Sequence, residues 1–161
     1  SNFLGCHQLI ITNAAGCLKK EWKLGEFMLM TDYLDYTFIR NSDPPEIIPI
    51  DLDIKTHSKV KKKASDMNIL LREGVYTWTL GPSYETAAEI QDIISLGGNA
   101  VGMSSVPEIV KSQELGLNII GISCLTNYGI GLAHDILSHK HVLEITSKVH
   151  ENFFKLIPAI I

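Results

Sequence analysis

Strand-forming and helix-forming segments alternate along most of this chain. Apolar and β-branched residues predict strands over residues 8–12, 26–34, 75–80, 100–103 and 118–123. Amphipathic patterns between them predict helices over residues 52–71, 83–96, 106–115 and 138–156. Helices that follow strands in this way usually connect one parallel strand to the next. The sequence therefore predicts an α/β fold with a mostly parallel central sheet flanked by helices.

Small and polar residues follow three of the predicted strands, at or close to the points where the next structural element should begin. These runs cover residues 81–89, 100–108 and 125–127. Ligand sites of open α/β sheets lie outside the carboxyl ends of the strands, where such loops converge. We therefore expect one pocket for a small polar ligand, assembled from several loops.

Length and composition are those of one globular domain. The chain has 161 residues, of which 45% are apolar and 20% charged, so residues 1–161 are expected to form a single domain. The net charge is −4, and Arg40 and Arg72 are the two arginines, which argues against nucleic acid as a partner. No apolar run approaches the roughly 20 residues that a membrane-spanning helix needs, so no membrane partner is expected.

Cysteine and histidine usage bears on the compartment and on cofactors. Cys6, Cys17 and Cys124 lack Cys-x-x-Cys spacing, and the first residues lack a secretory signal. Both observations predict free thiols in a reducing cytoplasm. None of the six histidines stands in a metal-binding motif such as His-Glu-x-x-His. We expect neither a metal nor another cofactor.

Several polar or small residues at predicted strand ends have both a structural and a functional interpretation. Glu85 is predicted near a helix N-terminus, where the helix dipole favours its charge, but it also offers a carboxylate to ligand N–H groups. Asn127 is a common turn former, and its amide is also able to donate to and accept from one planar ligand. The run from Asn13 to Gly16 is either a tight turn or an anion-binding nest. Local pattern alone leaves these alternatives open.

Four runs taken together resemble the trimeric purine nucleoside phosphorylases. They are Ile11-Thr-Asn-Ala-Ala-Gly16, Gly81-Pro-Ser-Tyr-Glu-Thr86, Gly102-Met-Ser-Ser-Val-Pro-Glu108 and Leu125-Thr-Asn127. All four occur in the order of that family and at similar spacing, and the similarity extends over most of residues 3–157. The resemblance implies a nucleoside phosphorylase-like three-layer fold, of which residues 1–161 would form the C-terminal portion.

The resemblance also implies an activity. Members of this family are glycosyltransferases of purine salvage, and they cleave 6-oxopurine nucleosides such as inosine and guanosine with inorganic phosphate. The products are the free base and ribose 1-phosphate, so phosphate is a co-substrate rather than a cofactor. The family further implies a homotrimer.

Matching positions imply a base site. Tyr84 would stack on the purine, and Glu85 would accept hydrogen bonds from N1–H and the 2-amino group of guanine. Asn127 would contact N7 and O6, where negative charge develops as the base departs. An asparagine at this position implies 6-oxopurines, since the related methylthioadenosine phosphorylases carry an aspartate there.

The same carry-over implies contacts to ribose and phosphate. Met103 would pack against the ribose, and His139 would bind the ribose 5′-hydroxyl group. The backbone N–H of Ala14 and the hydroxyl group of Ser104 would bind phosphate. The expected catalytic residues are Asn127, Glu85 and His139.

Two features depart from the family pattern. The Gly-Ser-Gly phosphate loop and the Arg-x-His motif of the family's N-terminal half have no counterpart here, so a separate N-terminal piece is an expected partner. The segment 32–53 is shorter than the family loop that reaches a neighbouring subunit. Two alternatives therefore stay open: a truncated, non-catalytic purine-binding subunit, or a phosphorylase for another nucleoside such as methylthioadenosine.

Overall fold

The computed structural model describes residues 5–39, 44–132 and 139–161. In chain order the elements are β1 (Gln8–Cys17), β2 (Phe27–Asp35), β3 (Ile47–Pro49), α1 (Ile54–Asp66), β4 (Leu71–Trp78), α2 (Ala87–Ser95), β5 (Ala100–Gly102), α3 (Val106–Glu114), β6 (Asn118–Tyr128) and α4 (His139–Ile160). Each predicted strand and helix is present, although several boundaries differ. β3 is an additional short strand that the sequence pattern did not predict.

The sheet is mixed, with the strand order β3-β2-β4-β5-β1-β6 and a further pairing between β2 and β6. The pairs β1–β6, β2–β4 and β4–β5 are parallel, whereas β1–β5, β2–β3 and β2–β6 are antiparallel. The prediction of a mostly parallel sheet is thus corrected. The antiparallel pairings are short, but those of β1–β5 and β2–β6 close five strands into a barrel-like circuit. The alternation of strands and helices along the sequence does not predict the β1–β5 and β2–β6 pairings, because each joins strands that are not neighbours in the chain.

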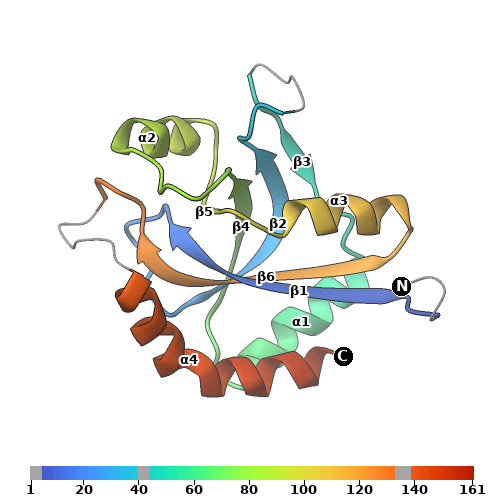
Figure 1. Cartoon of the computed structure of the whole chain (residues 1–161). Coiled ribbons are helices and arrows are strands. Elements are labelled where there is room, and N and C mark those ends of the chain that lie inside the picture. Colours follow the sequence, from blue (N-terminus) through green and yellow to red (C-terminus); the bar gives the residue numbers. More distant parts are fainter. Residues whose placement is uncertain (1–4, 40–43, 133–138) are drawn as a thin grey trace.

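Helices cover both faces of the sheet: α1 and α4 lie on one side, and α2 and α3 lie on the other (Figure 1). Along β2, successive side chains face opposite layers, as the two-residue period of a strand requires. Phe27 and Leu29 join the core cluster that includes residues of α1 and α4. Met28 and Met30 join the cluster that includes residues of α3. The sheet therefore has a buried core on each face.

The boundaries of α1, α2 and α4 differ from the predicted ones. α1 ends at Asp66 rather than at residue 71, where β4 begins. α2 begins after Thr86 rather than after Ser83, since Thr86 and Glu89 form a capping box that satisfies N–H groups at the helix start. Glu85 therefore lies in the loop before the helix, not in its first turn. α4 continues to Ile160, beyond the predicted end at residue 156, and Pro158 lies inside the helix. None of the helices in the described ranges is long and apolar enough to cross a membrane.

The run from Asn13 to Gly16 belongs to strand β1, which corrects the interpretation as a turn. β1 pairs with β6 along its length, with an irregularity between Ala15 and Gly16. A Cβ atom on Gly16 would lie 3.1 Å from Val101 Cγ1 and 3.2 Å from Asn127 Nδ2. A glycine is favoured here because the neighbouring side chains approach the backbone closely.

Candidate active site

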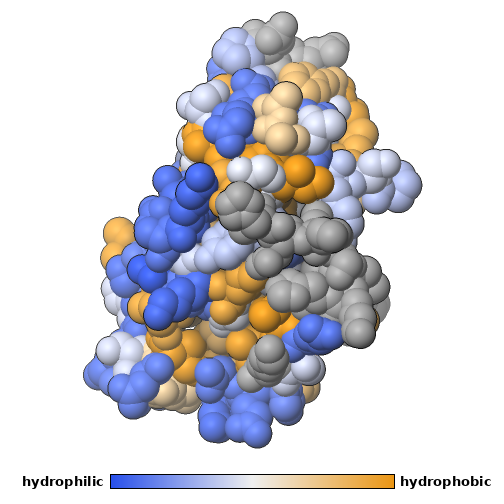
Figure 2. Space-filling model, turned by 90° about the vertical axis from the view of Figure 1, so that its left-hand side faces the viewer, coloured by the Kyte–Doolittle hydropathy of each residue, from blue (hydrophilic) through white to orange (hydrophobic). Residues whose placement is uncertain are grey.

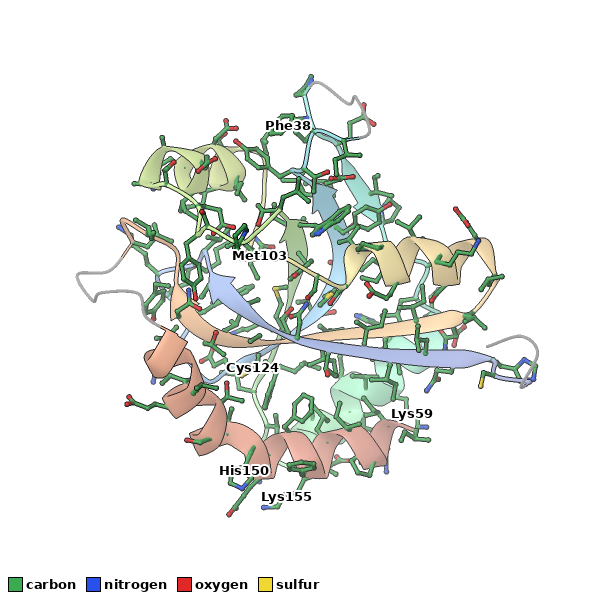
Figure 3. All side chains as sticks on the ribbon, viewed as in Figure 1. Phe38, Lys59, Met103, Cys124, His150 and Lys155 are labelled. Carbon is green, nitrogen blue, oxygen red and sulfur yellow. The ribbon has the colours of Figure 1, made fainter. Side chains whose placement is uncertain are left out.

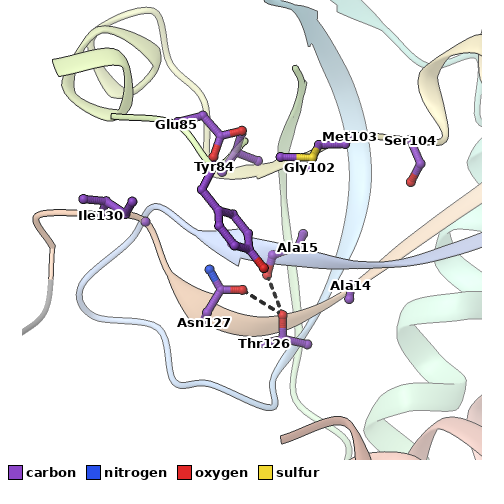
Figure 4. Close-up of a pocket in the computed structure, with 13 residues that line it drawn as sticks. Ala14, Ala15, Tyr84, Glu85, Gly102, Met103, Ser104, Thr126, Asn127 and Ile130 are labelled. Atoms are coloured by element: carbon purple, nitrogen blue, oxygen red, sulfur yellow. Dashed lines mark hydrogen bonds between the residues drawn. The ribbon is translucent and has the colours of Figure 1, made fainter. Parts of the chain in front are cut away.

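Four segments meet at a cavity of about 280 Å³ (Figure 4). They are the end of β1, the loop between β4 and α2, the connection from β5 to α3, and the end of β6. The cavity is lined by Ala14, Ala15, Gly16, Tyr84, Glu85, Val101, Gly102, Met103, Ser104, Thr126, Asn127, Gly129 and Ile130. The fold thus brings together six of the predicted site residues: Ala14, Tyr84, Glu85, Met103, Ser104 and Asn127.

His139, the remaining predicted site residue, is the first residue of α4. Its side chain lies outside the part of the chain that the structure describes. The expected contact with the ribose 5′-hydroxyl group therefore stays a prediction.

Apolar side chains contribute much of the cavity wall. Tyr84, Met103 and Ile130 line it and are 45%, 37% and 39% exposed. Seen from the left-hand side of Figure 1, the protein surface carries apolar patches between hydrophilic side chains (Figure 2). Apolar walls with a few polar groups are typical of sites that bind small molecules.

Hydrogen bonds hold the side chain of Asn127 at the end of β6. Its Oδ1 accepts from the Thr126 hydroxyl group at 3.0 Å, and its Nδ2 donates to the Tyr128 carbonyl oxygen at 3.2 Å. The residue is only 9% exposed. Because the amide nitrogen carries two hydrogens, one N–H remains for a ligand while the other is bonded to Tyr128. Tyr84 and Asn127 both line this cavity (Figure 4).

The carboxylate of Glu85 is held by a threonine. Thr79 donates its hydroxyl hydrogen to Glu85 Oε1, with an oxygen–oxygen distance of 2.6 Å. Glu85 lines the same cavity as Asn127, and also a neighbouring one that Thr79 and Phe38 line. Together, the carboxylate and the amide offer an acceptor and a donor to one space with apolar walls, a combination suited to a planar heterocycle.

Ala14 and Ser104 line another part of the cavity, which has features of an anion site. Ser104 directly precedes Ser105, the N-cap residue of α3. N–H groups at the start of a helix attract anions. Asn13 Nδ2 donates to Ser105 Oγ at 2.8 Å, which ties β1 to this helix start. In the view of Figure 4, Ala14 and Ser104 lie to the right, away from Glu85 and Ile130.

The described lining of this cavity includes no lysine, arginine or histidine. Arg72 is engaged elsewhere, because its guanidinium donates to both carboxylate oxygens of Glu26 at 2.7 and 3.2 Å. Arg40 lies outside the described residues. A phosphate ion bound here would therefore find only uncharged donors among the described lining residues.

Three residues near the site were given no role by the sequence analysis, although Gly81 and Thr126 belong to its motifs. Thr79 and Thr126 hold the side chains of Glu85 and Asn127. A Cβ atom on Gly81 would lie 2.7 Å from Met103 Sδ, so this glycine leaves room for the methionine. The position of Thr126 next to Asn127 in the sequence could have predicted a contact between their side chains. No local pattern connects Thr79 with Glu85.

The arrangement of potential metal ligands and of the cysteine thiols in the described part of the chain bears on the chemistry available to it. No group of three or more histidine, cysteine, aspartate or glutamate side chains there is arranged to hold a metal ion. Cys17 and Cys124 are buried and free. Burial raises the pKa of the Cys124 thiol to about 11, so this thiol is protonated at neutral pH. Cys124 also lies away from Met103, toward α4 (Figure 3).

The family follows from a match over nearly the whole chain: residues 3–161 match the phosphorylase superfamily. The chain belongs to the phosphorylase superfamily. The resemblance that four sequence motifs predicted is thereby confirmed at the level of the family.

Known relatives of this phosphorylase-superfamily chain are longer. It is 38% identical to purine nucleoside phosphorylase 1 of Bacillus subtilis, over 98% of this chain and 62% of the relative. It is 31% identical to the 6-oxopurine nucleoside phosphorylase of Pyrococcus furiosus, over 98% of this chain and 65% of the relative. The solved structure of Schistosoma mansoni purine nucleoside phosphorylase in complex with inosine is similar with a TM-score of 0.86 and 25% identity, covering 99% of this chain and 62% of that chain. The chain thus spans less than two thirds of the length of these relatives.

Proposed function

We propose that this phosphorylase-superfamily chain carries the base and ribose subsites of an enzyme that cleaves inosine and guanosine with phosphate in purine salvage. The observation that carries the proposal is that Asn127 and Glu85 line one cavity together with Tyr84 and Met103. In this proposal Glu85 accepts from N1–H of the base, Asn127 contacts N7 and O6, and Tyr84 stacks on the purine. Met103 packs against the ribose, and His139 binds its 5′-hydroxyl group.

The proposed chemistry needs no covalent intermediate with the protein. Phosphate attacks C1′ of the ribose while the bond from C1′ to the purine nitrogen breaks. The electron pair of that bond stays on the purine, so negative charge develops on the departing base. An Asn127 N–H held near N7 would bind this charge more strongly in the transition state than in the substrate. Removal of one such preorganised donor costs about 3–4 kcal/mol in enzymes that use it.

We infer that a further polypeptide segment pairs with β1 and completes the phosphate subsite beside Ala14 and Ser104. Over residues 8–15, β1 pairs with β6 on one edge, and its other edge has no partner strand among the described residues. Neither a charged residue nor a proline protects this apolar edge, as would be usual for a free one. The buried Oδ1 of Asn13 also has no hydrogen-bond partner in the described part of the chain. Such a segment would supply the cation that phosphate requires.

A cytoplasmic homotrimer is the proposed assembly. The support for trimerisation is the family resemblance, together with apolar side chains beyond the end of β2. Phe38 and Ile39 are 55% and 63% exposed, and Phe38 lines a cavity with Tyr84 and Glu85. A neighbouring subunit would cover these side chains next to the base subsite. The free cysteines support a reducing compartment.

Release of hypoxanthine from inosine, measured with and without phosphate, tests the proposed activity. We expect release only when phosphate is present and when the protein contains the segment that pairs with β1. The Asn127→Ala variant is the matched control and should release base more slowly by about two orders of magnitude. Folded protein that neither releases base nor binds guanosine would contradict the proposal.

A non-catalytic purine-binding subunit is the second candidate function. The observation that favours it is the uncharged lining of the cavity beside Ala14 and Ser104 in the described part of the chain. In this case the protein would bind guanosine but would release no base at any phosphate concentration.

A further inference from the structure

We propose that Thr79 is a positioning residue for base recognition, because its hydroxyl group holds the Glu85 carboxylate ready to accept the N–H groups of the purine. This role rests on the proposed function, in which Glu85 is the acceptor for the base. Thr79 belongs to none of the four motifs that carry the family resemblance.

Thr79 has a well-defined place in the fold. It directly follows β4, and its backbone N–H donates to the Gly102 carbonyl oxygen at 2.9 Å. The neighbouring Trp78 is paired with Gly102 in the parallel register of β4 and β5. Thr79 is only 5% exposed. The threonine is therefore anchored to the sheet, whereas Glu85 belongs to the loop before α2.

The hydroxyl group of Thr79 has two acceptors within reach. Its Oγ1 lies 2.6 Å from Glu85 Oε1 and 3.4 Å from the Gly102 carbonyl oxygen. A hydroxyl group has a single hydrogen, and the shorter contact with a charged acceptor is the stronger one. The hydrogen bond therefore goes to Glu85 and anchors one end of its carboxylate.

Anchoring of one oxygen leaves the rest of the carboxylate available to a ligand. Glu85 Oε2 accepts no hydrogen bond from the described residues, so it is able to accept a purine N–H group, and Oε1 keeps a second lone pair. Without Thr79, the glutamate side chain would sample several rotamers in the unliganded protein. The cost of ordering it would then reduce the affinity for the base.

Thr77, two residues earlier and on β4, offers a matched comparison. Thr77 is fully buried, and its hydroxyl oxygen has no hydrogen-bond partner in the described part of the chain. Thr77→Val and Thr79→Val replace the same hydroxyl group by a methyl group at buried positions two residues apart. A purely structural role predicts similar behaviour of the two variants in ligand binding, whereas a positioning role predicts a loss for Thr79→Val alone.

Titration calorimetry with guanosine in the absence of phosphate measures this difference without turnover. We expect Thr79→Val to raise the Kd between about 2- and 10-fold, the cost of ordering one rotamer-rich side chain on binding. Thr79→Ser keeps the hydroxyl group and should restore most of the affinity, and Thr77→Val should bind as the wild type does. Equal affinities of Thr79→Val and wild type would overturn the role of Thr79 while leaving the proposed function intact. A folded wild-type protein that binds no guanosine would overturn both.

A double-mutant cycle separates action through Glu85 from a general effect on the fold. In a Glu85→Ala background, Thr79→Val should cause no further rise in Kd. A further rise of similar size would overturn the proposal, because Thr79 would then act independently of Glu85. Thermal melting checks that each variant folds, and Thr79→Ala takes the place of Thr79→Val if the valine variant does not.

Discussion

Asn127 lines the cavity with its amide oxygen bonded to Thr126 and its amide nitrogen bonded to the Tyr128 carbonyl group. An amide held in this way presents one N–H at a defined position. A carboxylate in the same place would present only acceptors. In the proposed site, an asparagine at position 127 would therefore favour a 6-oxopurine, and an aspartate would favour a 6-aminopurine.

The substitution Asn127→Asp tests this dependence. We expect it to shift the ratio of kcat/KM for inosine over adenosine by at least about tenfold toward adenosine, because a carboxylate accepts from a 6-amino group and repels a 6-oxo group. Initial rates with both nucleosides give the ratio. Asn127→Ala, which lacks both groups, should lower both rates, and an unchanged ratio in Asn127→Asp would contradict the proposed contact.

Glu85 lies outside α2, so its removal should affect ligand binding more than folding. We expect Glu85→Ala to weaken guanosine binding by about tenfold or more, since hydrogen bonds to a charged acceptor are lost. Inosine should lose less, because it lacks the 2-amino group. Calorimetric Kd values and a melting curve test both expectations, and a protein that unfolds would show that Glu85 is structural.

The start of α2 determines where the loop that carries Tyr84 and Glu85 ends. Glu89 accepts hydrogen bonds from the backbone N–H and the hydroxyl group of Thr86 at 2.7 and 2.8 Å. These bonds, the backbone one first, lower the pKa of Glu89 below its ordinary value of 4.5. Tyr84 and Glu85, the two side chains proposed to bind the base, thus lie directly before a capped helix.

Loss of this capping box should destabilise the protein in a pH-dependent way. At pH 7 we expect Thr86→Ala to lower the free energy of unfolding by about 0.5–2 kcal/mol. A carboxylate with a lowered pKa stabilises the fold above its ordinary pKa and loses this effect as the pH falls through the folded value. The difference between wild type and Thr86→Ala should therefore shrink below pH 4.5, the ordinary pKa of Glu89.

Urea unfolding at pH 7 and near pH 3 measures these differences. Ser95→Ala, at the exposed opposite end of α2, serves as the control and should change the free energy of unfolding by less than about 0.5 kcal/mol. The same loss for Thr86→Ala at both pH values would show that the bond from the Thr86 hydroxyl group to Glu89 makes no contribution to stability.

The sheet closes into a circuit of five strands, yet several strand edges have no partner strand in the described ranges, among them one edge of β1. Ile10 packs toward the cluster containing α4, and Ile11 packs toward the cluster containing α3, so helices cover β1 on both faces. Along residues 8–15 one edge of β1 nevertheless has no strand beside it in the described ranges. An apolar edge of this kind pairs readily with other strands and promotes association.

A lysine on this edge should suppress such association. Thr12 is exposed on β1, and we expect Thr12→Lys to reduce aggregation of the chain and to weaken pairing with a further segment. Ser58→Lys adds the same charge at an exposed position of α1 and should change neither property. Light scattering as a function of concentration makes the comparison, and equal aggregation of both variants would argue against an open edge at β1.

The types and approximate positions of the helices and strands were predictable from sequence, apart from the short β3. Burial repeats every two residues in a strand and about every 3.6 residues in a helix, so these patterns are visible whichever partner covers the element. Motif order was enough to predict the family, and six of the residues that the motifs assigned to the site line one cavity. The motifs were informative because a ligand or a close approach of the backbone restricts the residue types at a position, as at Gly16.

Closure of the sheet, the open edge of β1 and the bond from Thr79 to Glu85 were decided only by the tertiary structure. None of these three features produces a repeating pattern in the sequence, so no periodicity or motif spacing predicts them. The first two depend on which distant strands pair, and the third depends on how the loop after β4 folds back over the strand end. Local propensity and patterning act within a few neighbouring residues, whereas these contacts form only when several elements pack together.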